Sequence, residues 1–194
     1  MAAEPARAKP TLAVFASDRG PGDPERASLM SYAGGMVARR KARLVSVAHD
    51  GYVAVPLITG ARAAGGEVLV IADETTTLPK ALADVAIERL ATEEERLQRV
   101  AALANLFVGL PGSLASAADL YKTWVRAGGG ASGKPVVLLN RNRAFEAMRG
   151  MAVDILSHSV RRQERMLVFT DNHEDLWNKI AWALGEAGHI PSSN

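Results

Sequence analysis

The chain has 194 residues, no cysteine and a formal net charge of +2, with 48% hydrophobic and 23% charged residues. This composition is typical of one globular domain with a full core, and it excludes disulfides, thiol nucleophiles and cysteine-ligated metals. No apolar run reaches the roughly 18 residues that a membrane span needs, and no signal peptide or dense basic patch is present, so we expect a cytoplasmic protein that binds neither membranes nor nucleic acid.

Residues 1–10 are mostly small or charged, which predicts a disordered leader before one domain that spans residues 11–190. In that domain, short apolar runs alternate with amphipathic stretches. The runs predict buried strands at 11–16, 43–48, 67–72, 105–110, 135–140 and 166–170. The stretches predict helices at 25–41, 53–64, 93–104, 114–127, 145–159 and 174–186. Residues 83–91 fit a short strand and a helix equally well.

Strands that alternate with helices in this way predict right-handed crossovers and a mainly parallel sheet. The expected fold class is therefore α/β, a modified Rossmann fold with three α/β/α layers and a sheet of about seven strands. In such sheets, ligands bind at the carboxyl ends of the strands, where the strand order reverses. We therefore expect the site in the loops at 17–23, 49–52, 73–79, 111–116 and 141–143.

The turn at Pro111, Gly112 and Ser113 is the segment of the sequence that most directly indicates a binding or catalytic site. It joins a buried strand to a helix, and the start of a helix presents unpaired N–H groups and a positive dipole end that bind phosphate. Ser113 and Ser116 add hydroxyl groups, and Asp119 follows within reach of the same pocket. The alternative interpretation is that Ser113 only caps the helix and that Asp119 is solvated.

The segment from Pro111 to Asp119 resembles the Pro-Gly-Gly-x-Gly-Thr-x-x-Glu motif of the Lonely Guy (LOG) family, also described as lysine decarboxylase-like, and of its relatives among the molybdenum-cofactor carrier proteins. Pro111 and Gly112 match the motif, and Ser116 and Asp119 are chemically similar to its Thr and Glu. Ser113 and Ala115 replace glycines. The order of the predicted elements extends the resemblance over about residues 11–184.

The resemblance implies a nucleotide-binding hydrolase that cleaves the N-glycosidic bond of a nucleoside 5′-monophosphate. A family arginine about fifteen residues before the turn corresponds in spacing to Arg96, which would position the substrate or stabilise charge. Asp119 would supply the carboxylate that steadies an oxocarbenium-like centre or activates water. The ligand and its phosphate would be held by residues of three loops, namely Ser17, His49, Pro111, Gly112, Ser113, Leu114, Ala115 and Ser116. Because the family pairs through its helices, the resemblance also implies a homodimer.

Several family glycines are absent after the second predicted strand, where Val47, Ala48 and His49 stand in place of a glycine-rich loop. The added side chains narrow this part of the pocket, and Asp119 is one methylene shorter than the family glutamate. The alternative to hydrolysis is therefore a non-catalytic nucleotide or molybdenum-cofactor (pterin) carrier, and a third interpretation is a partner-binding protein without a ligand. No cofactor is expected to be required. His158, His173 and His189 lack metal-ligand spacing, so no metal site is expected.

Overall fold

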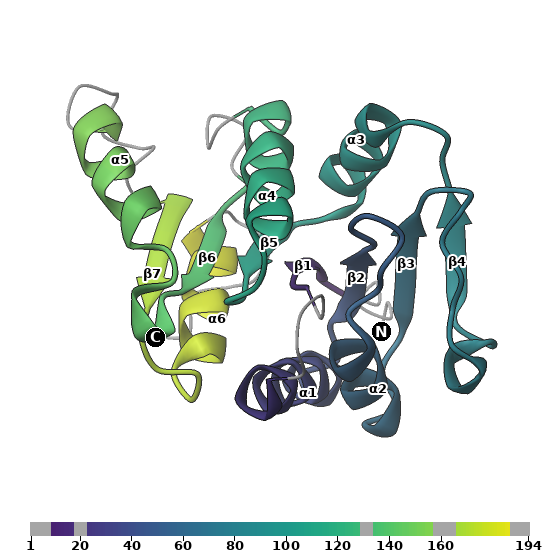
Figure 1. Cartoon of the computed structure of the whole chain (residues 1–194). Coiled ribbons are helices and arrows are strands. Elements are labelled where there is room, and N and C mark those ends of the chain that lie inside the picture. Colours follow the sequence, from purple (N-terminus) through teal and green to yellow (C-terminus); the bar gives the residue numbers. More distant parts are fainter. Residues whose placement is uncertain (1–8, 18–22, 129–133, 157–165, 187–194) are drawn as a thin grey trace, which may run out of the picture.

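The computed structural model describes residues 9–17, 23–128, 134–156 and 166–186. Its centre is a seven-stranded parallel sheet in the order β4-β3-β2-β1-β5-β6-β7 (Figure 1). The strands are Thr11–Phe15 (β1), Arg43–Val47 (β2), Val68–Ala72 (β3), Ala86–Arg89 (β4), Leu106–Gly109 (β5), Val136–Leu139 (β6) and Leu167–Thr170 (β7). The α-helices are Pro24–Arg39 (α1), Val55–Ala63 (α2), Glu93–Leu103 (α3), Leu114–Arg126 (α4), Glu146–Leu156 (α5) and Leu176–Glu186 (α6), with 3-10 helices at Lys80–Leu82 (η1) and Arg141–Arg143 (η2).

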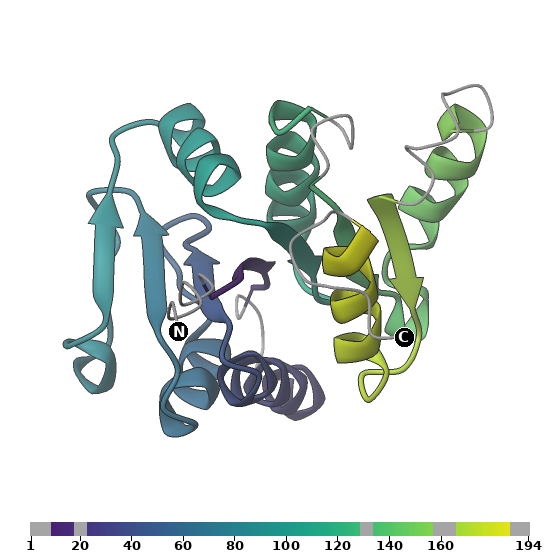
Figure 2. The same ribbon diagram turned by 180° about the vertical axis from the view of Figure 1, so that it is seen from behind.

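The helices cover both faces of the sheet. Helices α1, α2 and α6 lie on one face, and α3, α4 and α5 lie on the other (Figure 1, Figure 2). The described part of the chain therefore has three α/β/α layers around a parallel sheet. This confirms the predicted Rossmann-type fold with a parallel sheet of about seven strands.

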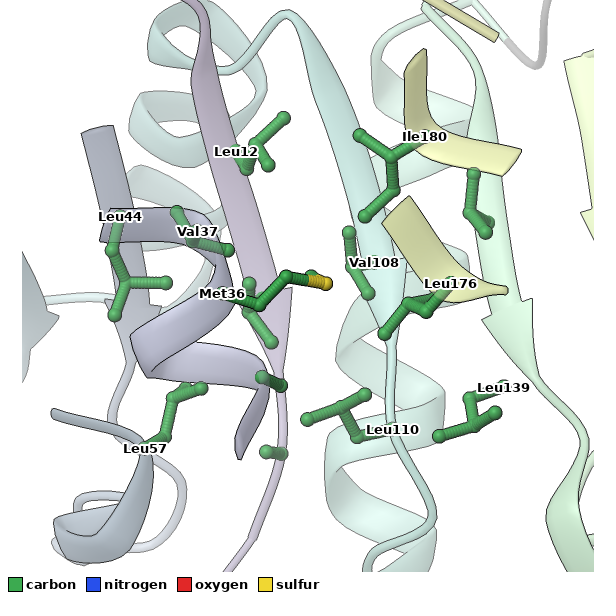
Figure 3. Close-up of a cluster of buried hydrophobic side chains, with 14 of the residues drawn as sticks. Leu12, Met36, Val37, Leu44, Leu57, Val108, Leu110, Leu139, Leu176 and Ile180 are labelled. Carbon is green, nitrogen blue, oxygen red and sulfur yellow. The ribbon is translucent and has the colours of Figure 1, made fainter. Parts of the chain in front are cut away.

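The central strands β1 and β5 are mostly apolar, and helices cover both faces of the sheet there. All residues of β1 and β5 are buried, and alternate side chains point to opposite faces of the sheet. Leu12 and Val14 belong to the cluster beneath α1, α2 and α6, whereas Ala13 and Phe15 belong to the cluster beneath α3 and α4. Figure 3 shows the first cluster, in which Leu12 lies near side chains of the covering helices.

The ambiguous segment at 83–91 contains the edge strand β4. Because β4 pairs only with β3 among the described strands, its residues are at most partly buried and its sequence is partly polar. An edge strand of four residues lacks the continuous apolar run by which the other strands are recognised. The preceding 3-10 turn η1 adds helix-like composition to the same segment.

Most predicted elements lie within two residues of their observed bounds. Helix α2 begins at Val55 rather than at 53, because Tyr52 pairs with His49 in a tight turn. Helix α6 begins at Leu176 rather than at 174, because Asn172 first closes a turn by accepting the N–H of Glu174. Helix α5 ends at Leu156, and the last predicted residues of this helix, 157–159, lie outside the described residues.

The first eight residues of the predicted leader also lie outside the described residues, whereas Lys9 and Pro10 are described. Within the described ranges, no helix combines the length and apolar character needed to cross a membrane.

Helices α1 and α2 pack in backbone contact. A Cβ atom on Gly34 would lie 2.0 Å from the carbonyl oxygen of Leu57, and one on Gly60 would lie 2.2 Å from that of Ser31. The Ser31 hydroxyl also donates a hydrogen bond to the carbonyl of Pro56. This contact fixes the middle of α1 against α2, on one face of the sheet.

Candidate functional site

The strand order reverses at β1. Strand β1 pairs with β2 on one side and with β5 on the other. The chain leaves β1 toward β2 and leaves β5 toward β6, so the two connections run in opposite directions from neighbouring strand ends. Such a reversal opens a crevice at the carboxyl ends of the strands, which is where ligands bind in open α/β sheets. The turn between β5 and α4 lies at this position.

Gly112 allows this turn to approach the end of β1. A Cβ atom at Gly112 would lie 2.8 Å from the Ser116 hydroxyl oxygen and 3.2 Å from the backbone nitrogen of Ser17. Ser17 is itself buried, with 4% of its surface exposed. The structure therefore places Ser17 next to the β5–α4 turn, and its part in binding a ligand stays a prediction.

Ser113 caps helix α4. Its hydroxyl oxygen accepts the N–H of Ser116 at 3.2 Å, and the Ser116 hydroxyl donates to the Ser113 carbonyl at 2.9 Å. The buried Ser116 hydroxyl is thus committed within the helix, whereas the Ser113 hydroxyl keeps its proton for another acceptor. The N–H groups of Leu114 and Ala115 open the helix, where the helical pattern provides no acceptor. These groups are the ones the turn offers to an anion.

A cavity of about 440 Å³ opens beside this turn. Its walls come from the start of α1, from the β5–α4 turn and from the segment after β6. The described residues that line it are Asp23, Glu25, Arg26, Leu29, Leu110, Pro111, Gly112, Ser113, Leu114, Ala117, Arg141, Asn142, Ala144 and Phe145. Its volume falls within the range of roughly 300–1,000 Å³ that is usual for small-molecule sites.

The cavity combines two arginines with two carboxylates. Arg141 Nη2 lies 2.5 Å from Glu25 Oε1, and Arg26 Nε lies 3.9 Å from Asp23 Oδ2. Asp23 is also the cap of α1, because its carboxylate accepts the N–H groups of Glu25 and Arg26. Asp23 is therefore engaged with the helix, and Arg26 is less tightly paired than Arg141.

A buried asparagine fixes the third wall of the cavity. Asn140 accepts the N–H of Phe145 at 2.7 Å and donates to Glu146 at 2.9 Å. The loop between them turns through Asn142 and Arg143, which both have positive φ angles. As a result, Phe145 belongs to the lining of the cavity, close to Arg141 in the chain.

Arg26 and Phe145 lie outside the loops in which the sequence places the site, and Arg141 lies in one of those loops, 141–143, without being predicted as an individual site residue. The signal for Arg141 is present in the sequence, because the loop 141–143 directly follows a buried strand and carries two arginines. Arg26 gives no comparable signal, because an arginine in the first turn of an amphipathic helix is ordinary. Only the tertiary packing that places the start of α1 beside the β5–α4 turn brings it to the cavity.

His49 and Asp119 form a second polar contact at the strand ends. His49 Nδ1 lies 2.7 Å from Asp119 Oδ2, and the side chains are 3% and 17% exposed. His49 is held by paired backbone hydrogen bonds to Tyr52 across a turn at Asp50 and Gly51, both of which have positive φ angles. The Nε2 atom of His49 is buried, and no hydrogen-bond partner for it is found in the described part of the chain. Asp119 is therefore bonded to His49 rather than solvated.

Arg96 lies near the carboxyl end of β3, where its charge acts on Asp73. Its guanidinium donates to the carbonyl of Leu90 at 3.4 Å. The Thr75 hydroxyl, which donates to Asp73, holds the pKa of that carboxyl below its ordinary value, and the nearby charge of Arg96 lowers it further. Neither Arg96 nor Asp119 is among the described residues that line the cavity. The catalytic roles of Arg96 and Asp119 stay predictions.

No family model matches the sequence, and no curated protein matches it. Solved structures do match. The molybdenum-cofactor carrier protein of Chlamydomonas reinhardtii superimposes with a TM-score of 0.68 at 15% identity, over 92% of this chain and 99% of that one. The chain has the fold of a molybdenum-cofactor carrier protein. This confirms, at the level of the fold, the resemblance carried by the Pro111–Asp119 segment.

Two further structures show how widely this fold is used. The molybdenum cofactor binding protein of Rippkaea orientalis matches with a TM-score of 0.65 at 16% identity, over 92% of this chain and 99% of that one. The DNA processing protein A of Streptococcus pneumoniae matches with a TM-score of 0.57 at 11% identity, over 88% of this chain and 61% of that one. Because the fold serves proteins with such different names, the function has to be argued from the site.

Proposed function

We propose that this chain binds a phosphate-bearing pterin of the molybdenum-cofactor type in the cavity beside the β5–α4 turn, and that it carries the cofactor without changing it chemically. The observation that carries the proposal is the cavity itself, which joins two arginines and an open helix start to an apolar wall. The shared fold with two proteins described as carrying or binding this cofactor supports the same ligand class.

The cavity fits the two chemically different ends of such a ligand. A phosphate is matched by the guanidinium groups of Arg26 and Arg141 and by the N–H groups at the start of α4. A flat ring system is matched by the side chains of Leu29 and Phe145, which form part of the same lining. The residues present therefore fit the group.

The protein's part in this proposal is to hold and orient the ligand. Among the described residues, no cluster of three or more His, Asp or Glu side chains is placed to hold a metal ion. The bound group would accordingly supply its own metal-binding chemistry. Ser113 would donate its free hydroxyl proton to the phosphate, and Phe145 would shield one side of the ring from water.

Hydrolysis of a nucleoside 5′-monophosphate is the second candidate, because the resemblance implies it. Cleavage of a glycosidic bond needs a carboxylate close to the anomeric carbon. The carboxylate of Asp119 instead lies 2.7 Å from the His49 ring nitrogen, and Asp119 is not one of the described residues around the cavity. This arrangement favours binding over turnover.

One experiment separates the two candidates. The purified chain would be dialysed anaerobically against molybdenum cofactor released from a molybdoenzyme, and the retained pterin would be measured by fluorescence after oxidation. We expect about one equivalent of pterin per chain and no free base when the chain is incubated with adenosine 5′-monophosphate. Absence of retained pterin would refute the carrier proposal, and release of adenine would establish hydrolysis instead.

A further inference from the structure

Arg141 is held from two sides at the rim of the cavity. Its Nη2 atom lies 2.5 Å from Glu25 Oε1, at the start of α1, and its Nη1 atom lies 3.3 Å from His173 Nδ1, in the segment between β7 and α6. The His173 ring in turn packs edge-on against Tyr32, with the ring centroids 4.9 Å apart. The guanidinium is therefore positioned by two elements that are distant from it in sequence, namely α1 and the segment between β7 and α6.

The two contacts of Arg141 differ in charge. A guanidinium has only donors, so His173 Nδ1 accepts this hydrogen bond, whereas the contact with Glu25 is one of opposite charges. Glu25 therefore supplies the negative charge in the cluster. The contact with Glu25 is an ion pair and the contact with His173 is a hydrogen bond, and no other hydrogen bond of the Arg141 guanidinium is found among the described residues.

The Glu25–Arg141 pair is exposed enough to exchange partners. The side chains are 58% exposed for Glu25 and 37% exposed for Arg141, and both residues line the cavity. An ion pair at this exposure is weak because water competes for both charges. An anion that enters the cavity meets an arginine already bound to a carboxylate, and it meets the repulsion of that carboxylate as well.

We propose that Glu25 is a built-in competitor for Arg141, which weakens the binding of the anionic end of the ligand and so eases its release. This inference rests on the proposed function, because it concerns the same cavity. A carrier has to release its ligand. When the phosphate leaves, the Glu25 carboxylate pairs with Arg141 in its place, and this pairing stabilises the ligand-free state. Glu25 thereby sets the residence time of the ligand, and Arg141 provides the attraction.

The test compares Glu25→Gln with Glu94→Gln. Each glutamate is the second residue of its helix and pairs with an arginine, but Glu94 pairs with Arg126 on α4 and lies away from the cavity lining. The two variants therefore share the change in net charge and the loss of one acidic group from a first helical turn. We expect Glu25→Gln to bind molybdenum cofactor roughly three- to fivefold more tightly, mostly through slower dissociation, and Glu94→Gln to bind as the wild type does.

A double-mutant cycle shows whether Glu25 acts through Arg141. Arg141→Gln alone should weaken cofactor binding, and Glu25→Gln should bring little or no gain in the Arg141→Gln background. An equal gain in both backgrounds, or unchanged or weaker binding in Glu25→Gln alone, would overturn the competition. If the wild-type chain binds no cofactor at all, the proposed function fails, and this inference fails with it. Thermal melts of all variants check that each remains folded.

Discussion

At the scale of single residues, Gly112 determines how closely the β5–α4 turn approaches the end of β1. Replacing it with alanine would bring a methyl group 2.8 Å from the Ser116 hydroxyl and 3.2 Å from the Ser17 nitrogen. The turn must then shift, and with it the N–H groups at the start of α4. We expect Gly112→Ala to lower the free energy of unfolding by about 1–3 kcal/mol and to weaken cofactor binding about tenfold or more.

Gly150 offers the matched control, because a Cβ atom there meets no heavy atom of the described structure within 4 Å. Gly150→Ala should leave cofactor affinity unchanged. Calorimetric titration gives the affinities, and urea titration gives the stabilities. Equal cofactor affinity in Gly112→Ala and wild type would show that the ligand does not use this turn.

The contact between His49 and Asp119 allows a second prediction at this scale. Removing the carboxylate would leave the Nδ1 atom of a ring that is only 3% exposed without its partner. We expect Asp119→Ala to lower the free energy of unfolding by about 1–3 kcal/mol, because a buried polar group then loses its hydrogen bond. Cofactor affinity should change less than twofold, as expected of a residue outside the cavity lining.

Adding His49→Phe to Asp119→Ala provides the check on that explanation. The second substitution removes the orphaned nitrogen atoms, so it should restore part of the lost stability. Urea titrations of the single and double variants measure the effect. No recovery in the double variant would argue against this hydrogen bond as the cause of the loss.

At the scale of elements, the contact between α1 and α2 depends on two glycines. Gly34→Ala and Gly60→Ala would each place a methyl group about 2 Å from a backbone carbonyl oxygen of the other helix. Backbone atoms cannot move aside for the added methyl group as the end of a flexible side chain can, so the two helices must move apart. We expect each substitution to lower the free energy of unfolding by at least about 2 kcal/mol, although alanine is the better helix former.

The helical Gly150 again separates packing from helix propensity. Because it has open space around it, Gly150→Ala should stabilise the chain by roughly 0.5–1 kcal/mol. Thermal melts monitored by circular dichroism compare the three variants. If Gly34→Ala is as stable as the wild type, the helices are not in the close contact that the structure shows.

The elements also show why sequence reasoning succeeded for some segments and not for others. Strand β1 is buried along its whole length, and a continuous apolar run is a signal that needs no knowledge of its neighbours. Strand β4 is short, partly polar and at the edge, so its assignment depends on the pairing with β3. Helix α4 was predicted to begin at Leu114 because Pro111, Gly112 and Ser113 mark its start locally.

The site was predictable only in part, because a local sequence signal marks some of its residues and only tertiary packing brings in the others. Gly112 and Ser113 belong to one local turn, and the sequence shows that turn directly. Arg26 and Arg141 reach the cavity because α1 and the segment after β6 pack on either side of that turn. The hydrogen bond between His49 and Asp119 joins residues that are 70 positions apart in the chain, and no local sequence pattern predicts it.

At the scale of the whole molecule, the homodimer implied by the family resemblance stays a prediction. Sedimentation velocity over a range of protein concentrations tests it directly. We expect a species of about twice the chain mass of 20.6 kDa. A single species at the chain mass across that range would contradict the prediction.

The position of the cavity has a consequence for how the molecule unfolds. Its walls come from the start of α1, the start of α4 and the segment after β6, so it exists only when both halves of the sheet are joined. A ligand that binds the folded chain alone stabilises the native state as a whole. A bound ligand should therefore slow hydrogen exchange in β1, β5 and β6 together. It would link the two halves of the sheet, so that they unfold as one cooperative unit.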